Sequence, residues 1–199
     1  MDDMTLDEVL DSVWQRWVRG RADRRSPFHT PIVATVDASG NPHQRVMVLR
    51  ETNRADRRLR FHTDVRSAKV EQIGDGASVS VIAYDATAKI QIRFTGSARI
   101  ERDGEAANLA WANSALTSKR CYLAEPAPGT PVKQPSSGLT DAQENALPAV
   151  EDLEAARPAF SVLFVSITSI EWLYLAARGH RRARFDWDGT EWVGTWLVP

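Results

Sequence analysis

Basic and hydroxyl side chains gather in two short segments, 45–50 and 62–69. Arg45 and Arg50 flank an apolar run, and Ser67 and Lys69 open a stretch typical of a short helix. A helix start offers unpaired N–H groups and partial positive charge, and cationic side chains bind phosphate through charge-assisted hydrogen bonds. Ser67, Lys69 and Arg45 are therefore predicted to hold a dianionic phosphate. The alternative is a solvated basic edge of a sheet.

Other catalytic motifs are missing from the sequence. It holds no P-loop, no Rossmann glycine fingerprint, no HExxH and no cysteine pair. His29, His43, His62 and His180 lack the spacing of metal ligands, so no metal site is expected. Cys121 is the single cysteine, and no neighbouring base marks it as a nucleophile, so a structural role is predicted for it.

Composition indicates one soluble domain. The chain has 199 residues, with 25 Lys plus Arg against 26 Asp plus Glu and a net charge of -1, so no overall field favours nucleic acid. The basic run 16–25 is interrupted by Asp23 and lacks an aromatic platform. No apolar run approaches the ~20 residues of a membrane span. The lone cysteine and an acidic start without signal-peptide features predict a cytoplasmic location.

A sheet must position the two basic segments. Apolar residues at helical spacing predict an N-terminal helix that begins with the capping-box pair Thr5 and Glu8 and ends at Gly20. From residue 26 the period changes to two, which predicts strands over 31–37, 44–50, 59–63, 77–84 and 89–101 and a short helix over 65–73. Short turns between five strands favour a small barrel, because closure removes exposed edges.

The second half of the chain returns to the sheet. A helix over 104–116, a proline-rich loop over 125–137 and a helix over 142–156 precede a strand over 160–176. A hairpin over 182–198 turns at Asp188-Gly189. Strands from both ends must share one core, so we expect a single domain over 1–199: an N-terminal helix (1–25), a barrel core (26–102), helices and a loop (103–157), and C-terminal strands with a dimerisation region (158–199).

Three motifs in this order resemble the flavin-binding core of the pyridoxamine 5'-phosphate oxidase family: QRVMVLR (44–50), FHTDVRSAK (61–69) and QIRFTG (91–96). The C-terminal segment, with Trp172, HRRARF (180–185) and WLVP (196–199), resembles that family's dimerisation region more weakly. The resemblance implies a mainly β (α+β) fold, an antiparallel, Greek-key-like split β-barrel with peripheral helices. It also implies a homodimer that binds flavin mononucleotide (FMN) at the subunit interface.

The resemblance assigns most of the flavin site to the first two motifs. Arg45 and Lys69 match the residues that hold the flavin phosphate, with Ser67 at the same helix start. Arg50 falls where the family has a lysine near the ring and substrate. The remaining matches line the isoalloxazine ring or the cofactor: Val46, Met47, Val48, Leu49, His62 and Thr63.

The second subunit is expected to complete the site. Gln91 matches a glutamine that hydrogen-bonds the flavin across the interface. Trp172 and Arg184 match a C-terminal tryptophan and arginine of the family, with a spacing that differs by about two residues.

The sequence departs from the family in its phosphate and substrate residues. Ala68 occupies the place of a second phosphate-binding arginine, so either Arg66 substitutes or the phosphate is held by one cation fewer. The family's substrate tyrosine has no counterpart near Ala115, and 180–184 reads HRRAR in place of an Arg-x-His signature. The remaining candidates for substrate contacts are Lys119, Arg181 and Arg182.

The resemblance favours an FMN-dependent oxidoreductase outside the vitamin B6 enzymes proper, in which flavin N5 accepts a hydride and the electrons pass to oxygen or another acceptor. Three alternatives stay open: a non-catalytic flavin-binding or stress-related protein, a true pyridoxamine or pyridoxine 5'-phosphate oxidase, and a split barrel that holds a deazaflavin or haem. The expected partners are a second copy of the chain and a small-molecule substrate or electron donor, with no nucleic acid and no membrane.

Overall fold

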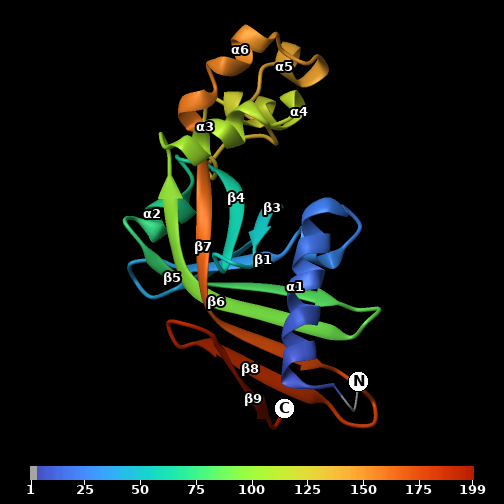
Figure 1. The fold of residues 1–199 in the computed structure, drawn as a ribbon. Helices are drawn as coiled ribbons and strands as arrows, with labels where there is room; N and C mark the ends of the chain where they lie inside the picture. Colours follow the sequence, from blue (N-terminus) through green and yellow to red (C-terminus); the bar gives the residue numbers. More distant parts are fainter. Residues whose placement is uncertain (1–3) are drawn as a thin grey trace.

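The computed structural model describes residues 4–199, in which nine antiparallel strands form one sheet (Figure 1). Their order is β2-β1-β5-β6-β7-β4-β3, with β8 paired to β7 and β9 to β8. The strands are β1 (Ile32–Val36), β2 (Pro42–Val46), β3 (Leu49–Asn53), β4 (Arg58–Asp64), β5 (Ala77–Asp85), β6 (Ile90–Glu101), β7 (Phe160–Tyr174), β8 (Arg181–Trp187) and β9 (Trp192–Leu197). The predicted mainly β fold, a split barrel with peripheral helices, is confirmed.

The long strand β7 joins the two halves of the sheet. Its first part pairs with β4, from Asp64↔Phe160 to Arg58↔Ser166, and its last part pairs with β8. Along its other edge β7 pairs with β6 over most of its length. In Figure 1 it runs from the helices at one end of the molecule to the β8–β9 hairpin at the other. Buried and half-buried residues alternate along β4, as expected for a strand with one face on a core.

The N-terminal helix α1 (Leu6–Ala22) confirms the predicted amphipathic helix and its capping box at Thr5 and Glu8. Its apolar face carries Trp17, whose ring stacks on Phe94 of β6 with centroids 4.6 Å apart. The predicted end at Gly20 is wrong, because α1 continues to Ala22. Gly20 instead allows close packing: a Cβ there would lie 2.6 Å from the Phe28 carbonyl oxygen in the 3-10 helix η1 (Pro27–His29).

The segment 44–50, predicted as one strand, is two strands. Val46 ends β2, which pairs with β1 through Ile32↔Val46. Leu49 begins β3, which pairs with β4 through Leu49↔Phe61. The chain therefore leaves one edge of the sheet and joins the opposite edge within two residues, Met47 and Val48. This change of partner opens the split in the barrel.

The helices between β6 and β7 form a cap at one end of β7 (Figure 1). We call residues 105–159 the helical cap; it contains α3 (Glu105–Ala112), α4 (Leu116–Lys119), η2 (Arg120–Leu123), α5 (Asp141–Asn145), α6 (Val150–Glu154) and η3 (Arg157–Ala159). The helix predicted over 104–116 ends early, at Ala112, and the one predicted over 142–156 is divided into α5 and α6. Trp111 and Tyr122 anchor the cap on Phe160 of β7, with ring centroids 5.2 Å apart in both pairs.

The short helix α2 (Ala68–Ile73) confirms the helix predicted before Gly74, although it begins later than expected. The predicted C-terminal hairpin is also confirmed, with Gly189 at φ 111° in its turn. No helix among residues 4–199 is long and apolar enough to cross a membrane.

Candidate functional site

A pocket of about 350 Å³ lies where the split in the barrel meets the start of α2 and the helical cap. Its lining combines most of the predicted phosphate and ring residues with three residues of the cap: Arg45, Val46, Met47, Val48, Arg50, His62, Thr63, Asp64, Lys69, Cys121, Tyr122 and Pro128. The fold therefore brings the two basic segments together, as predicted from their residue types.

The backbone at Met47 and Val48 forms one side of this pocket. Met47 N–H donates to the Pro31 carbonyl oxygen (3.0 Å), and then the chain crosses to β4. Val48 lines the pocket and belongs to no strand, so its peptide groups are not engaged in the sheet ladder. Peptide N–H and C=O groups in such a position can bind the polar edge of a planar ligand.

The start of α2 holds Lys69 in a fixed position. Its Nζ donates to Thr63 Oγ1 (3.1 Å) and to Ser67 Oγ (2.9 Å), and the Ser67 hydroxyl donates to the Asp64 carbonyl oxygen (2.7 Å). Burial lowers the pKa of Lys69, and the nearby positive charge of Arg45 lowers it further. Lys69 is thus a half-buried cation whose hydrogen-bond partners are hydroxyl groups.

Arg45 reaches α2 from β2, and it too has no carboxylate partner among the described residues. Its guanidinium donates to Thr35 Oγ1 (2.6 Å), the Val33 carbonyl oxygen and Gln72 Oε1. Within residues 4–199, none of Arg45, Arg50 and Lys69 has a carboxylate within ion-pair distance. Positive charges grouped without a counter-ion in a partly buried site favour binding of an anion. Phosphate is such an anion, and it accepts charge-assisted hydrogen bonds from arginine and from lysine.

Two buried nitrogen atoms beside the cations have no hydrogen-bond partner: Arg50 Nε and His62 Nε2. Burial, together with the charges of Arg50 and Arg60, lowers the pKa of His62 to about 3, so its imidazole is neutral at pH 7. The His62 ring packs edge-on against Phe160 (4.9 Å). Six other buried nitrogens among the described residues also lack a partner, but only Arg50 and His62 line this pocket, where a ligand can supply the hydrogen bond.

Several predicted residues lie elsewhere. Leu49 is buried in the core and Ser67 lies behind Lys69, whereas Arg66 is bound to Asp64 and to carbonyl oxygens of the cap. Gln91, Trp172 and Arg184 do not line the pocket of their own chain. This placement leaves untested the predictions that a second subunit supplies Gln91 and that Trp172 and Arg184 complete the flavin site.

The three candidate substrate residues also lie outside the pocket. Lys119 is buried, pairs with Glu154 (3.5 Å) and lies over the Trp111 ring. Arg182 pairs with Glu171 (2.6 Å), and Arg181 donates to the His180 carbonyl oxygen (3.0 Å).

Four pocket residues were not among the predicted site residues: Asp64 at the end of β4, and Cys121, Tyr122 and Pro128 of the cap. The three cap residues follow Lys119 in a segment without periodicity, so no local pattern placed them beside the barrel. The sequence interpretation also overlooked Arg178-Gly179-His180, which is an Arg-x-His triplet in the turn before β8. The sequence thus does contain an Arg-x-His triplet, which begins two residues before the segment 180–184.

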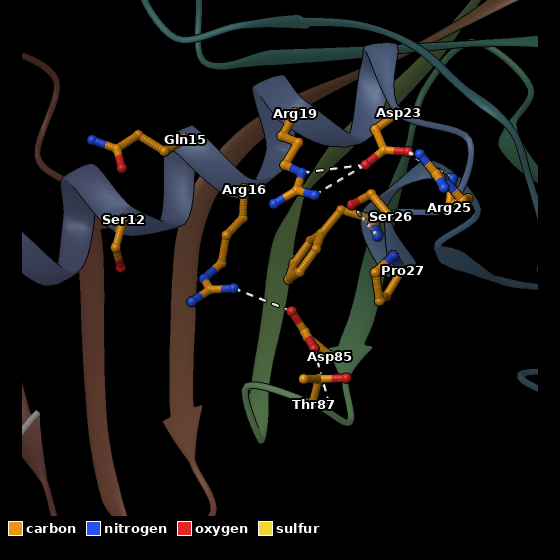
Figure 2. Close-up of a pocket in the computed structure, with 11 residues that line it drawn as sticks. Ser12, Gln15, Arg16, Arg19, Asp23, Arg25, Ser26, Pro27, Asp85 and Thr87 are labelled. Carbon is orange, nitrogen blue, oxygen red and sulfur yellow. Dashed lines mark hydrogen bonds and ion pairs between the residues drawn. The ribbon is translucent and has the colours of Figure 1, made fainter.

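A larger pocket, of about 760 Å³, lies between α1, η1 and the β5–β6 turn (Figure 2). It has a different electrostatic character. Arg16 pairs with Asp85 (3.2 Å) and Arg19 with Asp23 (3.1 Å), so these arginines already have counter-ions. We therefore place the candidate site at the smaller pocket.

An antiparallel split barrel with a cationic, partly apolar pocket at its opening defines a class of flavin- and phosphate-binding proteins, and comparison with known proteins agrees. Residues 11–102 match the family model of the FMN-binding domain of pyridoxamine 5'-phosphate oxidase. Through this segment the chain is similar to the FMN-binding proteins related to pyridoxamine 5'-phosphate oxidase.

Curated relatives match over part of their length. A pyridoxine/pyridoxamine 5'-phosphate oxidase of Yersinia enterocolitica is 35% identical over 71 residues, which are 35% of this chain and 32% of the relative. One from Yersinia pestis is 31% identical over 87 residues, or 43% of this chain and 39% of the relative. The chain thus matches less than two fifths of the length of either relative.

Solved structures share the fold over nearly the whole chain. A pyridoxamine 5'-phosphate oxidase-related, FMN binding protein from Nostoc punctiforme has a TM-score of 0.72 at 22% identity, covering 95% of this chain and 96% of that one. PhzG from Burkholderia lata, solved with tetrahydrophenazine-1-carboxylic acid, has a TM-score of 0.67 at 19% identity, covering 100% and 95%. At these identities the likeness establishes the fold.

Proposed function

We propose that the chain binds FMN in the smaller pocket and acts as an oxidoreductase. The observation that carries the proposal is the pair of cations, Arg45 and Lys69, at one end of a pocket that also holds the unpartnered nitrogens of Arg50 and His62. A phosphate would supply the missing counter-charge, and a polar ring edge would supply the missing hydrogen-bond partners. The residues present therefore fit FMN.

When bound, FMN supplies the redox chemistry, accepting a hydride at N5 and passing electrons to oxygen or another acceptor. The chain's own residues bind and orient it. Lys69 and Arg45 anchor the phosphate, with Ser67 and Thr63 holding the ammonium group of Lys69 in place. Arg50 keeps a positive charge near the ring, which favours a reduced, anionic flavin. Neutral His62 offers a hydrogen bond without adding charge.

The proposal includes a homodimer. Gln91 lies on β6 directly opposite Tyr84 of β5, so both side chains project from the same face of the sheet. Tyr84 is 46% exposed. In the adjoining β1–β2 pair, Ile32 and Val46 lie directly opposite each other, and both are also exposed. An exposed apolar face beside a residue that is expected to reach a second flavin supports burial of this face against another copy.

The test of this function is the absorbance spectrum of the purified protein, with the released chromophore identified by mass. We expect FMN, or saturable binding when FMN is added to the apoprotein. A haem or deazaflavin spectrum, or no binding of FMN, would contradict the proposal. Anaerobic mixing with candidate electron donors, followed by admission of oxygen, then separates an enzyme from a non-catalytic flavoprotein. Only an enzyme is bleached rapidly by its donor, regains its absorbance when oxygen reoxidises the flavin, and repeats the cycle.

A further inference from the structure

We propose that Arg66 is a positioning residue that fastens the cap side of the pocket to its phosphate end, rather than a ligand of the phosphate. We call Cys121, Tyr122 and Pro128 the cap wall, because the helical cap contributes these three residues to the pocket lining. The effect on flavin binding rests on the proposed function, whereas the fastening is a contact within the chain.

The guanidinium of Arg66 is shared between two parts of the pocket rim. Nε and Nη2 donate to the two carboxylate oxygens of Asp64, at 3.0 Å and 2.6 Å. Nη1 donates to the carbonyl oxygens of Ala124 and Glu125, at 2.9 Å and 3.1 Å. Asp64 ends β4, and Ala124 and Glu125 lie between Tyr122 and Pro128. One side chain therefore joins the barrel to the backbone of the cap wall.

These contacts leave Arg66 unsuited to replace the family's second phosphate-binding arginine. Hydrogen bonding to Asp64 raises the pKa of Arg66, and its side chain does not line the pocket. To reach an anion beside Lys69, Arg66 would have to release both cap carbonyl oxygens and the carboxylate. Because Ala68 carries no charge, Arg45 and Lys69 are the two cations that bind the phosphate. Arg66 affects binding indirectly, by holding the cap wall in place.

The cap wall depends on few other connections at this point. Tyr122 packs on Phe160 and Trp111, but the chain that follows is a loop with sparse backbone hydrogen bonds, such as Glu125 N–H to the Gly138 carbonyl oxygen (3.2 Å). Fixing two carbonyl oxygens with one planar guanidinium orders residues 124 and 125, and through them the wall.

The decisive variant is Arg66→Lys. Lysine keeps a positive charge beside Asp64, but it cannot span a carboxylate and two carbonyl oxygens. We expect the affinities for FMN and for riboflavin, which lacks the phosphate, to fall by the same factor, about three- to tenfold. Trypsin cleavage after Lys133, in the loop beyond the wall, should become several times faster. Arg19→Gln is the matched control, since Arg19 also binds an aspartate through Nε and Nη2 but lies on α1.

Two results would overturn the inference. Loss of FMN affinity with unchanged riboflavin affinity would make Arg66 a phosphate ligand, and parent-like binding and cleavage would show that the fastening has no effect. Thermal melts establish whether Arg66→Lys is folded. If it is not, the same comparison is made with Arg66→Gln, on which riboflavin affinity and the cleavage rate are measured, because neither involves a phosphate. If the parent binds neither flavin, the proposed function fails, and the cleavage rate alone decides whether Arg66 fastens the wall.

Discussion

Arg45 and Lys69 line one pocket, neither has an ion pair with a carboxylate among the described residues, and the charge of Arg45 contributes to the lowered pKa of Lys69. Two cations held together in this way destabilise each other until an anion binds. The free energy recovered when a phosphate arrives is therefore part of the affinity for FMN.

Lys69→Ala should weaken FMN binding by about 1.5 to 3 kcal/mol, the usual range for a hydrogen bond to a charged group. Riboflavin affinity should change little, because riboflavin has no phosphate for Lys69 to hold. Fluorescence titration of both ligands measures the difference. Lys133→Ala, in an exposed loop, is the control. An FMN affinity equal to that of the parent would remove Lys69 from the site.

His62 should make the stability of the apoprotein depend on pH. Its pKa is about 3 in the folded chain, mainly because of burial, and about 6.5 in an unfolded chain. Between these values the unfolded state binds more protons, so the free energy of unfolding is highest above pH 6.5 and falls as pH is lowered toward 3.

His62→Phe should flatten this dependence. Between pH 6.5 and 4.5 the parent should lose up to about 1.4 kcal/mol per pH unit more than the variant. Urea unfolding at several pH values measures the slopes, and His180→Asn, at an exposed position, should retain the parent's slope. Identical slopes for parent and His62→Phe would mean that His62 is not held neutral in the folded protein.

Gly20→Ala should destabilise the protein although alanine is the better helix former. The added Cβ would lie 2.6 Å from the Phe28 carbonyl oxygen, so α1 and η1 must move apart. We expect a loss of about 1 to 3 kcal/mol, typical of overpacking, which exceeds the gain of about 1 kcal/mol in helix propensity. Chemical denaturation measures it. Val18→Ala, at an exposed position of the same helix, should cost far less, and a more stable Gly20→Ala protein would contradict the close packing.

Tyr84→Glu should weaken the proposed dimer, because it places a charge in the exposed face that also carries Gln91. Sedimentation at micromolar concentration should show a shift toward monomer and a parallel loss of FMN affinity. Val132→Glu, in an exposed loop of the cap, should leave both unchanged. A parent that sediments as a monomer while binding FMN tightly would place the complete site within one chain.

The phosphate end of the site could be predicted from the sequence because local patterns set it. The period of two through β4 and the short helix before Gly74 place Thr63 and Lys69 on either side of the same turn. This placement depends on local sequence and not on the rest of the fold. The cap wall could not be predicted in this way. Tyr122 reaches the pocket only because the cap docks on Phe160, about forty residues further along the chain.

The split at Met47 and Val48 was missed for a different reason. An uninterrupted apolar run indicates a strand but carries no information about which neighbour each part of it pairs with. The change from β1 to β4 is set by barrel closure, which depends on strands distant in sequence.

Strand β7 also has a consequence for how the polypeptide folds. The hydroxyl of Ser161 donates to the Thr63 carbonyl oxygen across 98 positions, and β7 fills the gap between β4 and β6. The segment that matches the FMN-binding domain ends at residue 102, before β7 begins. A nascent chain of that length lacks the partner of both β4 and β6, and unpaired strand edges are prone to aggregation. High contact order should make closure slow, so the flavin-binding half completes its folding only after the C-terminal strand has been synthesised.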